Sequence, residues 1–314
     1  MNLLAKLAAT SMVLMVPCVL FAQPVTHETR MEILHGKPYV MVTVNGMGPF
    51  RFLVDTGTSG DAVVTPELAA QLKLPEVGQV HLNDAGGSGG EQLSVRLIDK
   101  LSIAGVEFYA IKAMEHSLLD GDGPCMGILG FRLFQGFLFT LDFPNRRVVI
   151  ADGELEADGE RLIHPFRIED GMPLMNLAFG DLQVEAVIDS AGAGLGIPEQ
   201  LAGRLRFATE PEIDGKQQSL SGSFLVKTRK LATDVRLGDI ILDQPWVEIN
   251  SIFPTANFGA GPMQHFAVTF DQDNLLLRVD GPHKHVALDV TPVPMQVARE
   301  AAGKTAIATH GPVQ

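Results

Sequence analysis

Apolar and polar residues alternate with a period of two in short segments along most of the chain. Val40, Val42 and Val44 lie on one face of such a segment, which ends at the turn dipeptide Asn45-Gly46, and another apolar run follows at once. Alternation with this period is typical of half-buried β-strands, and Asn-Gly between two strands indicates a tight hairpin. Comparable runs, separated by many of the 32 glycines and 19 prolines, continue to about residue 280. The pattern predicts an all-β protein.

The opening hairpin occurs twice. In the first copy the second strand ends at Asp55, and in the second copy, which begins at Asp170, it ends at Asp189. A glycine-containing loop follows each aspartate, and a short helical pattern then opens with Pro66 in one copy and Pro198 in the other. Proline favours the first turn of a helix. We therefore expect one short helix in each copy.

The two copies also close alike. Gly130 ends the tripeptide Ile-Leu-Gly and Gly259 ends Asn-Phe-Gly, and each glycine stands ten positions before a threonine, Thr140 or Thr269, inside an apolar run. One more apolar strand ends each copy. A repeat of strand, aspartate, helix, glycine and final strand in one order predicts two pseudo-symmetric lobes, residues 28–152 and residues 160–282.

Residues 1–22 have the pattern of a secretory signal peptide. Lys6 precedes an apolar stretch that ends at Ala22. A positively charged residue, an apolar segment and a small residue at the cleavage site are the three parts of a secretory signal peptide. An uncleaved membrane anchor is the alternative, although polar residues and Pro17 interrupt the stretch. Cys18 suggests a lipoprotein as a further alternative, but Pro17 stands where a small residue is expected before the lipid-bearing cysteine. We expect a periplasmic or secreted protein that has no membrane attachment after signal removal.

The net charge and the number of cysteines exclude some classes of function. The net charge of −13 argues against a nucleic-acid partner, because such a protein must neutralise phosphates. The two cysteines cannot build a disulfide scaffold or a zinc site on their own.

Residues 283–314, with Pro292 and Pro294, look like a loose C-terminal tail.

The stretch Phe-Leu-Val-Asp-Thr-Gly-Thr-Ser around Asp55 and the later Ile-Leu-Gly resemble the pepsin-like and retropepsin-like aspartic proteases over roughly residues 30–282. The resemblance implies two mostly β lobes that each lend one aspartate to a central cleft. It implies that Asp55 and Asp189 form the catalytic pair and that Thr56 and Ser190 brace the two loops. It further implies supporting roles for the glycines Gly57, Gly130 and Gly259.

Paired carboxyl groups suit peptide hydrolysis. Two carboxylates held within about 3 Å cannot both be ionised cheaply, so the pair shares one proton. The ionised member then takes a proton from water, which attacks the peptide carbonyl, while the protonated member donates a hydrogen bond to the carbonyl oxygen. This chemistry requires no metal and no cofactor, and we expect neither.

Two features depart from the family pattern. Ala191 stands where the first copy has Gly57, and its methyl group could crowd the partner loop or turn the Asp189 carboxylate away. The glycine-rich stretch that contains Gly87, Ser88 and Gly89 lies where the family folds a flap over its substrate, but it carries no tyrosine. It is either a flap or an ordinary surface loop.

Two functions follow from these residues. The first is an exported aspartic endopeptidase that acts on peptides or unfolded proteins, and we expect a monomer because both half-sites lie in one chain. The second is a catalytically inactive module that keeps the lobes and binds peptides or proteins. Ala191 and the tyrosine-free flap motivate this second hypothesis.

Overall fold

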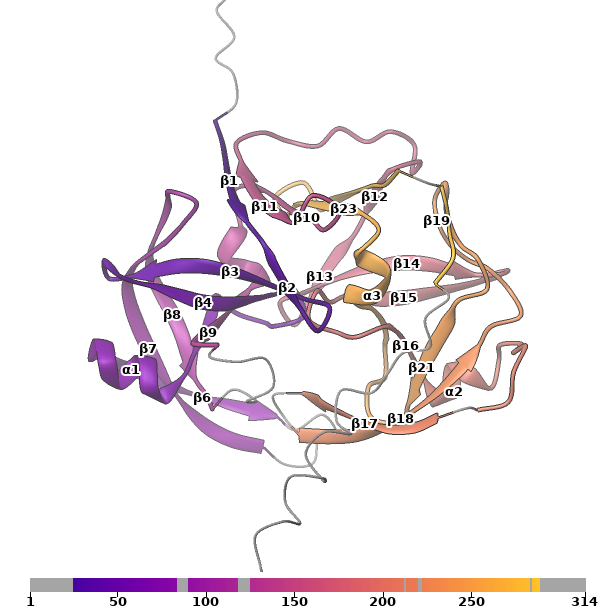
Figure 1. Ribbon diagram of the computed structural model, residues 1–314, viewed down its shortest axis with the longest axis horizontal. Coiled ribbons are helices and arrows are strands. Elements are labelled where there is room, and N and C mark those ends of the chain that lie inside the picture. The colour runs from indigo at the N-terminus through magenta and orange to yellow at the C-terminus, as the bar shows by residue number, and fades with distance from the viewer. Residues whose placement is uncertain are drawn as a thin grey trace, which may run out of the picture.

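A computed structural model describes residues 25–83, 90–117, 125–211, 213–219, 222–282 and 284–288. Strands dominate these residues, and their arrangement is an all-β acid-protease-like fold, as the sequence predicts. Figure 1 shows the first half of the chain on the left and the second half on the right. The predicted signal segment 1–22, the glycine-rich residues 87–89 and most of the predicted tail lie outside the described residues.

The first half forms an eight-stranded sheet in the order β2-β3-β4-β9-β5-β8-β7-β6. Strand β4 runs parallel to β9, and β5 runs antiparallel to β9 and parallel to β8. The strands are β2 (Glu32–Leu34), β3 (Lys37–Val44), β4 (Met47–Asp55), β5 (Ala62–Val64), β6 (Glu76–Asn83), β7 (Gly90–Ile103), β8 (Val106–Glu115) and β9 (Gly127–Gly130).

The second half forms an eleven-stranded sheet that contains the path β14-β15-β22-β16-β21-β18-β17. This path repeats the first-half path β3-β4-β9-β5-β8-β7-β6 strand for strand, so the duplication extends through the whole sheet. The strands are β13 (Arg167–Glu169), β14 (Met172–Phe179), β15 (Leu182–Ile188), β16 (Leu195–Pro198), β17 (Ile213–Ser219), β18 (Gly222–Lys230), β19 (Val235–Leu237), β20 (Ile240–Leu242), β21 (Trp246–Asn250), β22 (Ala256–Phe258) and β25 (His285–Val286).

Strand β25 corrects the expectation of a loose tail from residue 283. Its two residues pair in parallel with β20, and Val286 is buried. The apolar Val286 belongs to the main hydrophobic core, which is why this part of the segment is ordered against the sheet.

A third sheet joins the two halves (Figure 1, top). Its order is β1-β11-β10-β23-β24-β12, so three strands of one half meet three of the other. At the junction Thr140 lies opposite Thr269, and their hydroxyl oxygens are 2.9 Å apart. The strands are β1 (Thr26–Arg30), β10 (Leu138–Asp142), β11 (Arg147–Ala151), β12 (Ile163–Pro165), β23 (Ala267–Asp271) and β24 (Leu276–Asp280).

Both predicted helices are present. In α1 (Pro66–Leu72) the Thr65 hydroxyl accepts a hydrogen bond from the backbone N–H of Leu68 at 3.2 Å, which caps the first turn. The second, α2 (Glu199–Ala202), follows Pro198 and buries Leu201. Two further short helices follow the closing glycines, the 3₁₀-helix η1 (Phe131–Phe134) and α3 (Ala260–Met263).

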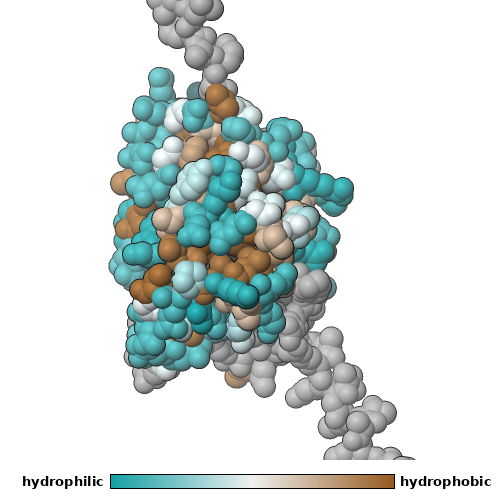
Figure 2. All heavy atoms as spheres, turned by 90° about the vertical axis from the view of Figure 1, so that its left-hand side faces the viewer, coloured by the Kyte–Doolittle hydropathy of each residue, from teal (hydrophilic) through white to brown (hydrophobic). Residues whose placement is uncertain are grey.

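The buried core continues through both halves and the joining sheet. Phe139 of β10 stacks on Phe134 at a ring distance of 3.7 Å and lies 6.1 Å from Phe270 of β23. The outer face of the first half is mostly hydrophilic, with apolar side chains gathered across its middle (Figure 2). Among the described residues, no helix is long and apolar enough to span a bilayer.

Candidate active site

The two aspartates end equivalent strands. Asp55 is the last residue of β4 and pairs in register with Gly130 of β9, while Asp189 follows β15 directly, beside β22. The closing glycines let backbone come close behind the aspartate loops. A Cβ on Gly130 would stand 2.4 Å from the Gly60 carbonyl oxygen, and a Cβ on Gly259 would stand 2.4 Å from that of Gly194. Only glycine fits such an approach.

Thr56 and Ser190 bind each other's loops through four reciprocal hydrogen bonds. Each hydroxyl donates to a backbone carbonyl across the junction, Thr56 to Ile188 at 2.6 Å and Ser190 to Val54 at 2.7 Å. Each hydroxyl also accepts the other residue's backbone N–H at 3.0 Å. Both side chains are fully buried. The two aspartate loops are therefore held together by fully partnered polar groups.

Asp55 is partly exposed, and its carboxyl group receives hydrogen bonds on both oxygens. The backbone N–H of Gly57 donates to its Oδ1 at 2.8 Å, and the hydroxyl of Thr58 donates to its Oδ2 at 2.7 Å. A hydroxyl can either donate or accept a hydrogen bond. This setting is therefore compatible with both the ionised and the protonated form of Asp55.

Asp189, also partly exposed, receives three donors. The backbone N–H groups of Ala191 and Gly192 donate to Oδ1 at 2.9 and 2.8 Å, and the Asn257 side-chain amide donates to Oδ2 at 2.7 Å. All three are N–H groups, which can only donate. Both oxygens of the Asp189 carboxyl group therefore act as acceptors.

The Asp189 carboxyl group faces the loop of Asp55. A Cβ placed on Gly57 would lie 2.7 Å from Asp189 Cγ, so the missing side chain of Gly57 makes room for this carboxyl group. Ala191, for its part, packs against the apolar cluster of the first lobe that includes Tyr39 and Ile128. Its methyl group has a place in the fold, and its N–H still donates to Asp189.

Burial raises the pKa of Asp55 to about 7 from an ordinary value of 3.8, and the nearby charge of Asp189 acts in the same direction. The hydrogen bonds from Thr58 and Gly57 and the charge of Lys37 oppose the shift without cancelling it. Neighbouring carboxyl groups in different settings divide a proton unequally. Below about pH 7, Asp55 therefore carries a proton.

The predicted flap stretch 87–89 lies outside the described residues, between β6 and β7. These two strands pair as a hairpin from Glu76 to Arg96. The second half repeats the hairpin with β17 and β18, and in Figure 1 both hairpins lie on the lower side of the molecule, opposite the joining sheet. Local sequence patterns do not predict this second hairpin, but the repeat of the first half implies it.

A metal centre finds no support in the described parts of the chain, where no three His, Cys, Asp or Glu side chains are grouped as ligands. The polar groups around the two aspartates are donors rather than ligands. The side chains that meet at this site are therefore suited to proton transfer.

Residues 40–133 match a family model described as aspartyl protease. The match begins in β3, contains Asp55 to Thr58 and ends at Leu133, shortly after Gly130, so it covers most of the first lobe and supports an aspartyl protease family. Asp189 and its donors lie outside it. No curated protein matches the chain.

Two donors at the site were not assigned roles from the sequence. Thr58 is the third residue after Asp55, whereas Gly192 occupies the same place after Asp189 and has no hydroxyl. In the sequence, Asn257 begins the tripeptide Asn-Phe-Gly, where the first copy has Ile128. The missing hydroxyl at Gly192 and the amide at Asn257, taken together, were the signal in the sequence that the donor to Asp189 had changed.

Proposed function

We propose that the protein is an aspartic endopeptidase in which Asp55 and Asp189 activate water. One observation carries the proposal: each half presents a carboxyl group, the two loops are joined by the Thr56 and Ser190 hydrogen bonds, and the Asp189 carboxyl group faces Gly57. The match to an aspartyl protease family over residues 40–133 supports the same class.

The different settings of the two carboxyl groups suggest their roles. Ionised Asp189 accepts a proton from a water molecule, whose oxygen attacks the carbonyl carbon of the substrate peptide. Protonated Asp55 donates to the carbonyl oxygen, which becomes a hydroxyl of a tetrahedral intermediate. Return of a proton to the amide nitrogen allows the C–N bond to break and yields a carboxyl and an amino terminus.

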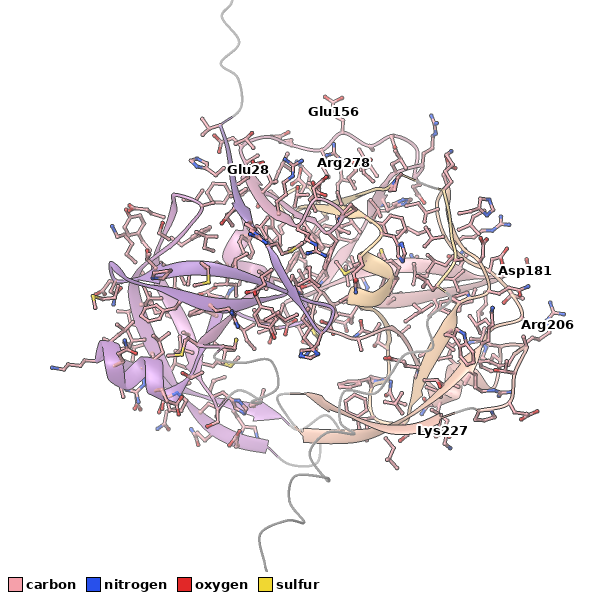
Figure 3. All side chains as sticks on the ribbon, in the orientation of Figure 1. Glu28, Glu156, Asp181, Arg206, Lys227 and Arg278 are labelled. Atoms are coloured by element: carbon pink, nitrogen blue, oxygen red, sulfur yellow. The ribbon has the colours of Figure 1, made fainter. Side chains whose placement is uncertain are left out.

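Hydrolysis of unfolded polypeptides across a pH series tests the proposal. We expect cleavage by the wild type and a loss of at least about a thousandfold in kcat for Asp55→Asn and Asp189→Asn, because each variant removes one half of the proton relay. Asp181→Asn is the matched control: this aspartate lies in the exposed turn after β14 and points outward in Figure 3. Cleavage that Asp55→Asn leaves undiminished contradicts the proposal.

An inert wild type would point to the inactive binding module. In that case Ala191→Gly distinguishes a blocked enzyme from a wrong assignment, because it restores the Asp-Xaa-Gly pattern of the first lobe. Hydrolysis gained by Ala191→Gly would support the binding module for the natural chain. The contacts of Ala191 described above lead us to expect activity without this change.

We further propose that the protein acts outside the cytoplasm as a monomer on peptide or unfolded protein substrates. The location follows from the signal-like pattern of residues 1–22, and the monomer from the presence of both half-sites in one chain. N-terminal sequencing of the exported protein and its sedimentation in solution test these two points. A retained residue 1 or a stable dimer would contradict them.

A further inference from the structure

The two lobes hold the outer oxygen of their aspartates by different side chains. In the first lobe the donor is Thr58, three residues after Asp55. In the second lobe the residue in that place is Gly192, and the donor comes from Asn257 in β22 instead. The chemical contact is the same, but its source has moved from the aspartate loop to a neighbouring strand.

The register of the strands shows that Asn257 replaces an apolar residue. Strand β9 sets Ile128 beside Leu53 of β4, and β22 sets Asn257 beside Val187 of β15. Ile128 makes apolar contacts only, within the cluster of Tyr39. Asn257 is therefore the polar member of an otherwise equivalent pair of positions.

The surroundings of Asn257 are adapted to it. Gly196 of β16 pairs with Asn257, and a Cβ there would stand 3.2 Å from the Asn257 Cβ, whereas Val63 occupies the equivalent place beside Ile128. A Cβ on Gly192 would stand 2.7 Å from Asp189 Oδ2 and 2.9 Å from Asn257 Nδ2. A side chain at position 192 would therefore crowd both the Asp189 carboxylate and the Asn257 amide.

The position of Asn257 also has an energetic cost. Its Oδ1 is buried and has no hydrogen-bond partner among the described residues. Leaving a buried acceptor unpaired is unfavourable, whereas a hydrogen bond to a charged group is among the stronger ones. A purely structural role would be met at lower cost by an apolar residue such as Ile128.

We propose that Asn257 is a positioning residue of the second half-site, which fixes the Asp189 carboxylate in place of the hydroxyl that Gly192 lacks. The inference rests on the proposed peptidase function, because the consequence is catalytic. Asn257 acts through Asp189 rather than on the substrate. It holds the acceptor of the water proton oriented toward the Asp55 loop.

Three variants test the proposal in the full chain. For Asn257→Ala we expect kcat to fall about 10- to 100-fold, the loss of one charge-assisted hydrogen bond, with KM within about threefold of the wild type. Asn257→Leu, which has a similar size but no N–H donor, should lower kcat to the same extent.

Ile128→Ala is the matched control at the equivalent position of the first lobe. It removes more apolar contact than Asn257→Ala and should lower stability, yet leave kcat unchanged; Ile128→Val serves if the larger truncation does not fold. Wild-type kcat in Asn257→Ala or in Asn257→Leu would overturn the proposal.

A readout without catalysis separates this inference from the proposed function. In protein labelled with ¹⁵N-asparagine, the Asn257 side-chain amide, assigned as the signal missing from Asn257→Ala, should shift with pH in the wild type and lose that shift in Asp189→Asn. An inert wild type with this titration rejects the peptidase and keeps the hydrogen bond. An Asn257 signal insensitive to Asp189→Asn rejects the positioning role whether or not the protein cleaves peptides.

Discussion

The raised pKa of Asp55 makes the stability of the fold depend on pH. Because its pKa is raised from 3.8 to about 7, the folded protein binds this proton more tightly than the unfolded chain does. The resulting stabilisation is fully present below pH 3.8 and is lost as the pH rises through 7. A side chain that remains neutral should avoid this loss.

Asp55→Asn should therefore raise the free energy of unfolding at pH 8 by about 2–4 kcal/mol relative to its effect at pH 4, since one pKa unit corresponds to about 1.4 kcal/mol. The neutral amide fits the site, because the Thr58 hydroxyl can accept as well as donate. Urea unfolding of both proteins from pH 4 to pH 8 measures the difference. A difference that stays constant over this range would mean that Asp55 is not held protonated.

The same protonation predicts the alkaline side of the activity profile. If hydrolysis requires protonated Asp55, kcat/KM should decline about tenfold per pH unit above the Asp55 pKa of about 7. Initial rates on a peptide substrate between pH 5 and pH 9 provide the test. Activity that continues to rise up to pH 9 would assign the proton elsewhere.

At the scale of elements, the short parallel pairings of β4 with β9 and β15 with β22 set the aspartate loops. Each pairing brings a closing glycine against the backbone of the loop region that follows the aspartate. The crowding involves carbonyl oxygens rather than flexible side chains. The loop cannot adjust without losing the hydrogen bonds that converge on the carboxylates.

Gly259→Ala should for this reason lower the free energy of unfolding by at least about 2 kcal/mol, since its Cβ would overlap the Gly194 and Gly192 carbonyl oxygens. The control is Gly78→Ala in β6, where a Cβ would meet nothing within 4 Å. Thermal unfolding of both variants measures the effect. Equal melting temperatures would show that the close approach behind Asp189 is not tight.

At the scale of the whole molecule, the joining sheet and the Thr56–Ser190 hydrogen bonds connect the two halves independently of the chain between them. Strands β10 and β23 pair over five residues from Leu138 to Asp142, and the aromatic core passes beneath them. The connecting segment after β11 runs over the surface, and Glu156 points away from the body in Figure 3. The covalent link is therefore not what holds the halves together.

A single cut engineered after Glu156 should leave a stable complex of both halves. We expect the nicked protein to elute as one species of unchanged size under native conditions and to keep its proposed activity, because no site contact passes through the cut. Two fragments in a denaturing gel verify the cleavage. Separation of the fragments under native conditions would contradict this view of the joining sheet.

Local patterns in the sequence were sufficient for the strands, the short helices and the duplication. Alternating valines predict β3, Pro66 predicts α1, and the matched order around Asp55 and Asp189 predicts two similar halves. These features depend on neighbours along the chain, through backbone sterics and periodic burial. These features can therefore be predicted from the sequence alone.

Only the tertiary structure decided which residues, distant in the sequence, surround the two aspartates. The hydrogen bond from Asn257 to Asp189, the place of Ala191 against the first lobe and the rise of the Asp55 pKa to about 7 all arise from groups brought together by folding. Their energies depend on distances and desolvation that no local pattern encodes. The sequence by itself determined two aspartate-bearing halves, and the fold decided which donors each carboxyl group receives.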